Sequence, residues 1–232
     1  MTAPPGWHPH QQQQQQWGPP PPGYGYPPMP PKKSKAPVVI VVIAVLLLLG
    51  GGGTAAFFYF NAHKDGGRAH TGDKLPERCT TVSEATLAAV RTTNPNAKMS
   101  NEMNSNGRKF TSCSWTQTKG RDGEGLRSLS LRIEQGDETR QTYEMWERQA
   151  KSNGQGTIQT KELSGAGDQG AVILVLTDSA FTEVDMVVRK GDTVVGLDYI
   201  GWDVGIFSPT KPDLAEFEQN ARKALDEVVA KI

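Results

Sequence analysis

The sequence is poor in the residue types on which most active sites depend. It has only four histidines, and none of them lies after residue 70. This scarcity disfavours a Ser-His-Asp triad, a histidine general base or a histidine-based metal site in the rest of the chain. We therefore predict a protein that is not an enzyme, with no catalytic residues, no metal site and no cofactor.

Carboxylates, unlike histidines, are plentiful, with 25 Asp and Glu in the chain. Any two of them are able to converge as a glycosidase pair, so composition leaves that alternative open. A solvated surface explains them better. The acidic residues concerned are Asp168, Asp178, Glu183, Asp185, Asp192, Asp198 and Asp203.

Cysteine is also scarce, since Cys79 and Cys113 are the only two. Two cysteines fall short of the four ligands of a structural zinc site. In an oxidising compartment a lone pair usually forms a disulfide, which here closes a loop of about 35 residues. We predict this disulfide. Two unpaired, buried thiols in a cytoplasmic domain are the alternative.

The chain has no excess of basic residues, because 25 Lys and Arg balance 25 Asp and Glu. Residues 1–37 contain three lysines and no acid, so the remainder is slightly acidic. A nucleic-acid partner requires a basic patch. We therefore predict no nucleic-acid partner.

Charged side chains are absent from residues 38–60, a run of 23 residues. A helix of this length rises about 34 Å and crosses a hydrocarbon core of about 30 Å. We predict a signal-anchor in the cell membrane, with a cytoplasmic N-terminus and an extracytoplasmic C-terminal domain. A secretory signal cleaved at residues 54–56 is the alternative. Small residues over 50–56 would allow a homodimer through the span.

Composition divides the rest of the chain into three parts. Residues 1–37 are rich in proline and glutamine, so we predict a disordered cytoplasmic tail. This tail either docks a proline-recognising partner or has no dedicated partner. Residues 61–74 are polar and lack periodicity, which indicates a juxtamembrane linker. An extracytoplasmic domain is expected over 75–232, which is long enough for one core.

Hydrophobic periodicity predicts an α+β domain. Helices are expected to open at Thr81, in a capping box with Glu84, at Asp137, and at Thr210 in a capping box with Asp213. Strands are expected at 110–117, 129–134, around Ile158, and at 171–176, 184–188 and 193–200. We summarise the order as αββαβββα, a mainly antiparallel sheet with helices packed on it.

Two glycine-containing segments are candidate sites. Residues 201–207 join the last strand to the last helix, and Trp202, Ile206 and Phe207 form a candidate recognition surface for another envelope protein or a small apolar ligand. Plugging the end of the core is the alternative. Residues 165–170 resemble a phosphate-binding loop, but an apolar strand follows where a helix is needed, so we interpret them as a turn.

Four features occur together: Cys79 before the first helix, Cys-Ser-Trp at 113–115, Gly-Asp at 167–168 before an apolar strand, and a hairpin over 187–195. This combination resembles the extracytoplasmic domains of a family of actinobacterial envelope proteins of unknown function. It is also similar in style to the extracellular sensor domains of mycobacterial Ser/Thr kinases. The resemblance covers about residues 75–230 and implies no catalytic residues.

These observations lead to one functional expectation and one alternative. We expect a single-pass, membrane-anchored cell-envelope protein whose extracytoplasmic domain binds without catalysis. The alternative is a transmembrane sensor or accessory subunit that signals to a cytoplasmic partner through its proline-rich tail.

Overall fold

The computed structural model describes residues 36–152 and 156–232. The strands are β1 (Asn94–Pro95), β2 (Asn101–Ser105), β3 (Arg108–Thr116), β4 (Leu126–Gln135), β5 (Thr157–Glu162), β6 (Gln169–Leu176), β7 (Thr182–Lys190), β8 (Thr193–Val204) and β9 (Pro209–Thr210). The α-helices are α1 (Ala36–Ala62), α2 (Glu84–Ala89), α3 (Thr139–Ser152) and α4 (Leu214–Val229), and the 3-10 helices are η1 (Glu77–Thr81) and η2 (Ala97–Met99).

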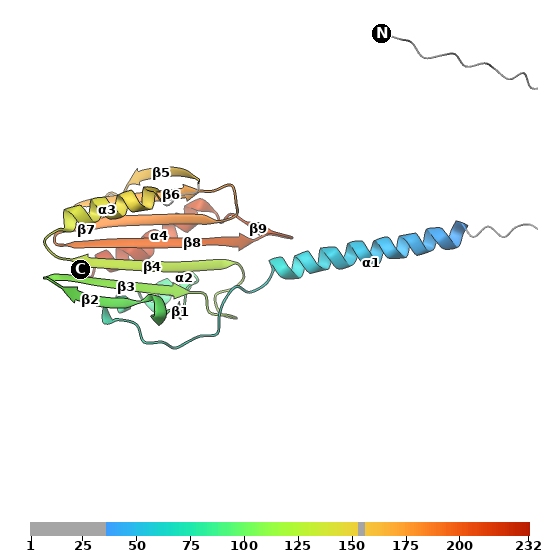
Figure 1. Cartoon of the computed structure of the whole chain (residues 1–232), viewed down its shortest axis with the longest axis horizontal. Helices are drawn as coiled ribbons and strands as arrows, with labels where there is room; N and C mark the ends of the chain where they lie inside the picture. Colours follow the sequence, from blue (N-terminus) through green and yellow to red (C-terminus); the bar gives the residue numbers. More distant parts are fainter. Residues whose placement is uncertain (1–35, 153–155) are drawn as a thin grey trace, which may run out of the picture. The chain divides into compact units, whose positions relative to one another are not determined.

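One antiparallel sheet of nine strands organises the chain after α1 (Figure 1). Seven strands follow the path β1-β3-β4-β8-β7-β6-β5, while β2 pairs with β3 and β9 pairs with β8. All of these pairings are antiparallel. The predicted α+β class with a mainly antiparallel sheet is therefore confirmed.

The element order differs from the expected αββαβββα. Five strands, β5 to β9, lie between α3 and α4 where the expected order has three, and β1 and β2 are additional strands before β3. The two-residue strands β1 and β9 are too short to show any periodicity. All five residues of β2 are exposed, so no apolar alternation marks it in the sequence.

The main core lies between the sheet and α4. The apolar stripe of α4 is buried as its spacing predicts, with Phe217, Ala221 and Leu225 packed among inward-facing strand residues. Asp213 caps this helix, because its carboxylate accepts a hydrogen bond of 2.9 Å from the Glu216 N–H. The expected cap at Thr210 is wrong, since that residue belongs to β9.

Helix α3 covers part of the opposite face of the sheet (Figure 1). Its buried side is the predicted one, with Thr139, Tyr143, Trp146 and Ala150 all under 8% exposed. Tyr143 and Trp146 pack against valines of β7 and β8. Helices therefore cover both faces of the sheet, and the apolar clusters under α3 contain fewer buried residues than the main core.

The first helix of the domain begins later than expected. A capping box from Thr81 to Glu84 is wrong, because Thr81 ends the 3-10 helix η1. Ser83 caps α2 instead, and its hydroxyl accepts a hydrogen bond of 3.2 Å from the Thr86 N–H. Ser and Thr are both good cap residues, so the sequence alone did not separate the two positions.

Helix α1 has 27 residues and is long and apolar enough to cross a membrane. At 1.5 Å per residue it measures about 40 Å, against about 30 Å for a hydrocarbon core. The predicted tail lies outside the described residues except for its last two positions. The boundaries at 37, 60 and 74 remain predictions.

The disulfide between Cys79 and Cys113 is present, as predicted. It joins η1, near the start of the domain, to β3 inside the sheet, with 5.6 Å between the two Cα atoms. Both residues are buried. The bond supports an oxidising environment for this domain.

Candidate functional site

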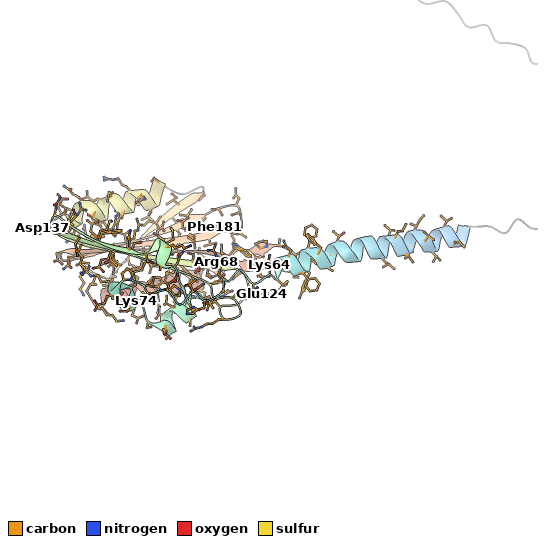
Figure 2. The ribbon with its side chains drawn as sticks, turned by 60° about the horizontal axis from the view of Figure 1, so that its bottom comes forward. Lys64, Arg68, Lys74, Glu124, Asp137 and Phe181 are labelled. Atoms are coloured by element: carbon orange, nitrogen blue, oxygen red, sulfur yellow. A yellow bond between two sulfur atoms is a disulfide. The ribbon has the colours of Figure 1, made fainter. Side chains whose placement is uncertain are left out.

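Residues 63–74, called the strap below, lie along the domain (Figure 2). The backbone of Arg68 makes two hydrogen bonds with the chain that follows β3. Its N–H donates to the Gln117 carbonyl at 3.0 Å, and its carbonyl accepts from the Lys119 N–H at 2.7 Å. The predicted linker is therefore docked on the domain by strand-like pairing.

Side chains fix the strap at two further points. The Asp65 carboxylate accepts hydrogen bonds from the N–H groups of Gly120 at 2.6 Å and Gly67 at 2.7 Å. These backbone hydrogen bonds, led by the one from Gly120, lower the pKa of Asp65. Further along, the Thr71 N–H donates to the side-chain oxygen of Asn94 at 3.1 Å.

Two glycines allow the strap to approach so closely. A Cβ atom at Gly67 would overlap the backbone of Lys119, and one at Gly66 would overlap the carbonyl of Gly125. In the sequence this Gly-Gly pair indicates a linker. Glycine is also found where two backbones approach closely. This property of the Gly-Gly pair is the sequence signal that could have revealed the docking of the strap on the domain.

A buried carboxylate organises the loop beneath the strap. Asp122 is 6% exposed, and one of its oxygens accepts three hydrogen bonds. They come from the Thr93 N–H at 2.8 Å, the Thr93 hydroxyl at 2.8 Å and the Thr118 N–H at 2.7 Å. This network links the chain after α2 to the loop after β3, and so positions Thr93 and Arg121 on the domain side of a cleft.

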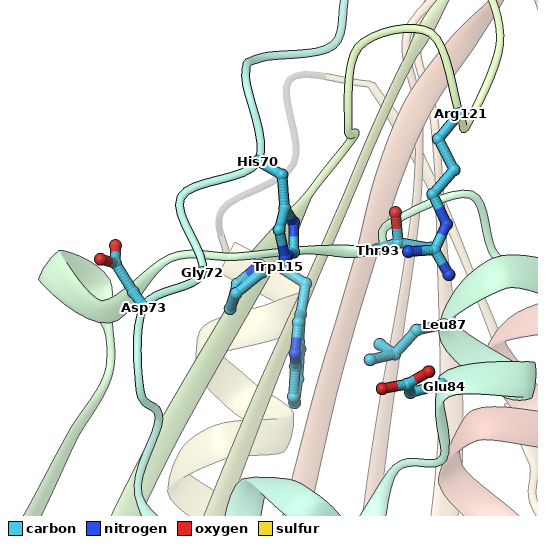
Figure 3. A pocket seen from close by; sticks show the side chains of 9 residues that line it. His70, Gly72, Asp73, Glu84, Leu87, Thr93, Trp115 and Arg121 are labelled. Atoms are coloured by element: carbon cyan, nitrogen blue, oxygen red, sulfur yellow. The ribbon is translucent and has the colours of Figure 1, made fainter.

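A cleft of about 240 Å³ lies between the strap and the domain (Figure 3). Trp115 of β3 and Leu87 of α2 form its apolar floor, and both are buried. His70, Gly72 and Asp73 of the strap line its other side, and the Asp73 carboxylate points away from Trp115. The cleft therefore exists only while the strap is docked.

Charges of both signs surround the apolar floor. Figure 3 shows Arg121 and Glu84 on one wall, above and below Leu87, with Asp73 on the other side. Within residues 36–152 and 156–232, none of these three charged side chains forms an ion pair. Free charges of opposite sign beside an apolar floor suit a small ligand that carries both an ammonium and a carboxylate group.

The three residues predicted as a recognition surface do not lie together on one loop. Trp202 belongs to β8 and is half-buried, in register with Leu126 of β4. Ile206 and Phe207 occupy the turn between β8 and β9 and are 69% and 56% exposed. The recognition role of these residues remains a prediction, and Ile206 and Phe207 are better placed for it than Trp202 because they are exposed.

A pair of carboxyl groups, one of them buried, lies on the sheet face that carries α3. Asp185 of β7 is 3% exposed and stands opposite Asp198 of β8. Burial, followed by the nearby charge of Asp198, raises the pKa of Asp185 from 3.8 to about 9. Asp198 pairs with Arg132 at 3.3 Å, and this guanidinium lies over the Trp146 ring. The expectation of a solvated surface is therefore wrong for Asp185.

Two further observations concern cofactors. Gly165–Gly170 leads into strand β6, so no helix N-terminus is available there for a phosphate. In the described part of the chain, no three His, Cys, Asp or Glu side chains are grouped so that they would hold a metal ion.

Comparison with known proteins adds no assignment to this geometry. No family model matches the chain, and neither a curated protein nor a solved structure matches it. The function is therefore inferred from the cleft, the strap and the helix alone.

Proposed function

We propose that the chain is a single-pass protein of the cell envelope, with a cytoplasmic N-terminus and an extracytoplasmic domain that binds without catalysis. The length and apolar character of α1 support the membrane anchor. The buried disulfide supports placement of the domain in an oxidising compartment. The cleft between the strap and the domain is the ligand site of this proposal.

The observation that carries the proposal is the arrangement of free charges around the Trp115 floor. Arg121 offers a planar fork that matches a carboxylate, while Glu84 on the same wall suits an ammonium group (Figure 3). The cleft volume of about 240 Å³ lies below the range of drug-sized sites, so the ligand is small. An amino acid, or the end of a short peptide, has this size and this pair of charges.

We expect the substitution Arg121→Ala to weaken binding of such a ligand at least tenfold. A hydrogen bond to a charged group contributes about 1.5–3 kcal/mol, and 1.4 kcal/mol corresponds to a factor of ten. The measurement is isothermal titration of the full chain in detergent, with alanyl-alanine and free alanine as the probes. Arg140, an exposed arginine of α3, provides the matched control Arg140→Ala.

The results separate the parts of this proposal. Weaker binding in Arg121→Ala and Glu84→Ala, with unchanged affinity in Arg140→Ala, supports the cleft as the ligand site. Absence of saturable binding by either probe at millimolar concentration contradicts it, as does equal affinity in all variants. Hydrolysis of alanyl-alanine by the parent chain would contradict a non-catalytic role.

A second candidate function is a transmembrane sensor that signals through the proline-rich tail. One observation favours it: the strap that lines the cleft follows α1 directly, since α1 ends at Ala62 and the strap begins at residue 63. A ligand that contacts both walls stabilises the docked strap. Ligand binding is thereby coupled to the segment that joins the span to the domain.

The substitution Gly67→Val tests this coupling, because a side chain at residue 67 overlaps the Lys119 backbone. We expect trypsin to cleave after Lys64 and Arg68 about tenfold faster in this variant than in the parent chain. Alanyl-alanine should slow that cleavage in the parent and leave the variant unaffected. Ala69→Val, at an exposed strap position, is the control and should cleave at the parental rate. Equal cleavage in Gly67→Val and Ala69→Val would exclude the coupling.

A further inference from the structure

The hairpin formed by the end of β8 and by β9 carries two large apolar side chains at its tip. Ile206 and Phe207 lie between Gly205 and Ser208, whose N–H and carbonyl form a hydrogen bond of 2.9 Å. Gly, Pro, Asn, Asp and Ser are the usual residues of such turns. Turn chemistry therefore does not explain an exposed Ile-Phe pair at this position.

The base of the hairpin is held firmly, so its tip is a fixed projection of β8. Asp203 pairs with Thr210 across the hairpin. The Asp203 carboxylate forms ion pairs with Arg127 and, at 3.2 Å, with Arg91. Arg127 also donates a hydrogen bond of 2.7 Å to the Trp202 carbonyl. The apolar tip therefore does not fold back to bury its own side chains.

Contacts place this hairpin beside the start of the strap (Figure 1). Gly125 forms a β-bridge with Asp65, and a Cβ atom at Gly125 would lie 2.7 Å from the Trp202 carbonyl. His63 is 2.8 Å from the carboxylate of Glu124. The hairpin and the first residues after α1 therefore share one end of the domain.

The chain between α1 and this end of the domain is very short. Asp65 is three residues after Ala62, the last residue of α1, and three residues extend at most about 11 Å. The apolar run closes with aromatic residues at 57–60, which are typical of a membrane interface. If α1 spans a membrane, the end of the domain that carries the hairpin is held at the lipid headgroups.

We propose that the β8–β9 hairpin inserts Ile206 and Phe207 into the interface of the membrane that α1 crosses. The occupant of the apolar tip is lipid, because the short tether presents the tip to the bilayer whenever the anchor is in place. Exposed Lys211, next to the hairpin, is suited to lipid phosphate groups. The inference rests on the anchoring helix of the proposed function and is independent of the ligand cleft.

The test uses the full chain in phosphatidylcholine vesicles, with acyl chains that are either brominated near the headgroup or unbrominated. Phe207→Trp adds a fluorophore at the tip, and the signal is the added emission relative to the parent chain. We expect brominated lipid to remove at least half of this added emission. Bromine quenches tryptophan only at short range, so the loss reports contact with lipid.

Two further variants calibrate the measurement. Met103→Trp is the matched negative control, because Met103 is 54% exposed, close to the 56% of Phe207. Met103 pairs with Phe110 of β3, which in turn pairs with Glu134 of β4. Trp202, at the base of the hairpin, pairs with Leu126 of β4. Glu134 and Leu126 are eight residues apart, which is about 27 Å along the strand. Phe57→Trp, inside α1, is the positive control.

The three variants give distinguishable outcomes. Quenching at 57 and 207 but not at 103 supports insertion of the hairpin. Quenching at 57 alone overturns the inference and leaves the membrane anchor intact. The same result is expected if a protein, and not lipid, covers the tip. Lack of quenching at all three positions overturns the anchor itself, and the hairpin proposal with it.

Discussion

Replacing both Cys79 and Cys113 with alanine is expected to lower the free energy of unfolding of the domain by about 3–4 kcal/mol. The bond joins residues 34 positions apart, and the chain-entropy relation gives this value for a loop of that length. Its position adds a structural consequence. The disulfide ties η1 to β3, so its loss frees the segment that leads from the strap into α2.

Urea unfolding of the full chain in detergent, followed by tryptophan fluorescence, measures this loss. Trp115 and Trp146 are both buried in the folded domain, so their emission reports its unfolding. Reductant provides the internal control. It should lower the stability of the parent chain to that of the double variant and leave the double variant unchanged. A parent chain that is insensitive to reductant under unfolding conditions would contradict the disulfide.

Elements with a strong repeat were predictable because their signal lies within a few residues. In β4, Leu129, Leu131 and Ile133 alternate with polar residues, and all three are buried. In α3, the spacing of Tyr143 and Trp146 identifies the buried side in the same way. A pattern of this kind depends only on the period of the backbone, which is a local property.

The docking of the strap was not predictable, because its partners are distant in the sequence. Asp65 contacts Gly120, which is 55 positions away, and Thr71 contacts Asn94. A polar segment without periodicity gives no indication of such partners. The cleft, which needs both the strap and the domain, was therefore missed, although Cys79 and Cys113 were paired correctly.

Burial of Asp185 was missed for a related reason. Alternation in β7 assigned Val184, Met186 and Val188 to one face, which is buried in the main core. Asp185 falls on the opposite face, for which the sequence predicts a solvated surface. In the structure, Ile173 stands opposite Asp185 and packs against Ala150 of α3. Periodicity separates the two faces of a strand but does not tell whether a helix covers the second one.

The substitution Asp185→Asn is expected to stabilise the domain at pH 7 by about 2 kcal/mol. Burial and the charge of Asp198 raise the pKa of Asp185 from 3.8 to about 9. At pH 7 the folded side chain keeps its proton while the unfolded one has released it, so linkage opposes folding by up to about 4 kcal/mol. Asparagine never ionises, so the substitution removes this opposition to folding. It keeps the cost of burying a polar group, and we therefore expect a net stabilisation of about half of the 4 kcal/mol.

The sign of the pH dependence distinguishes this effect from a general change in packing. The contribution of Asp185 to stability is fully present below about pH 4 and is lost as the pH rises toward about 9. The difference in unfolding free energy between Asp185→Asn and the parent should therefore grow from pH 4 to pH 8. Asp178→Asn, at an exposed carboxylate, is the control and should differ little from the parent at any pH. A pH-independent difference for Asp185→Asn would mean that Asp185 is already ionised in the folded domain, with Arg132 balancing both carboxylates of the pair.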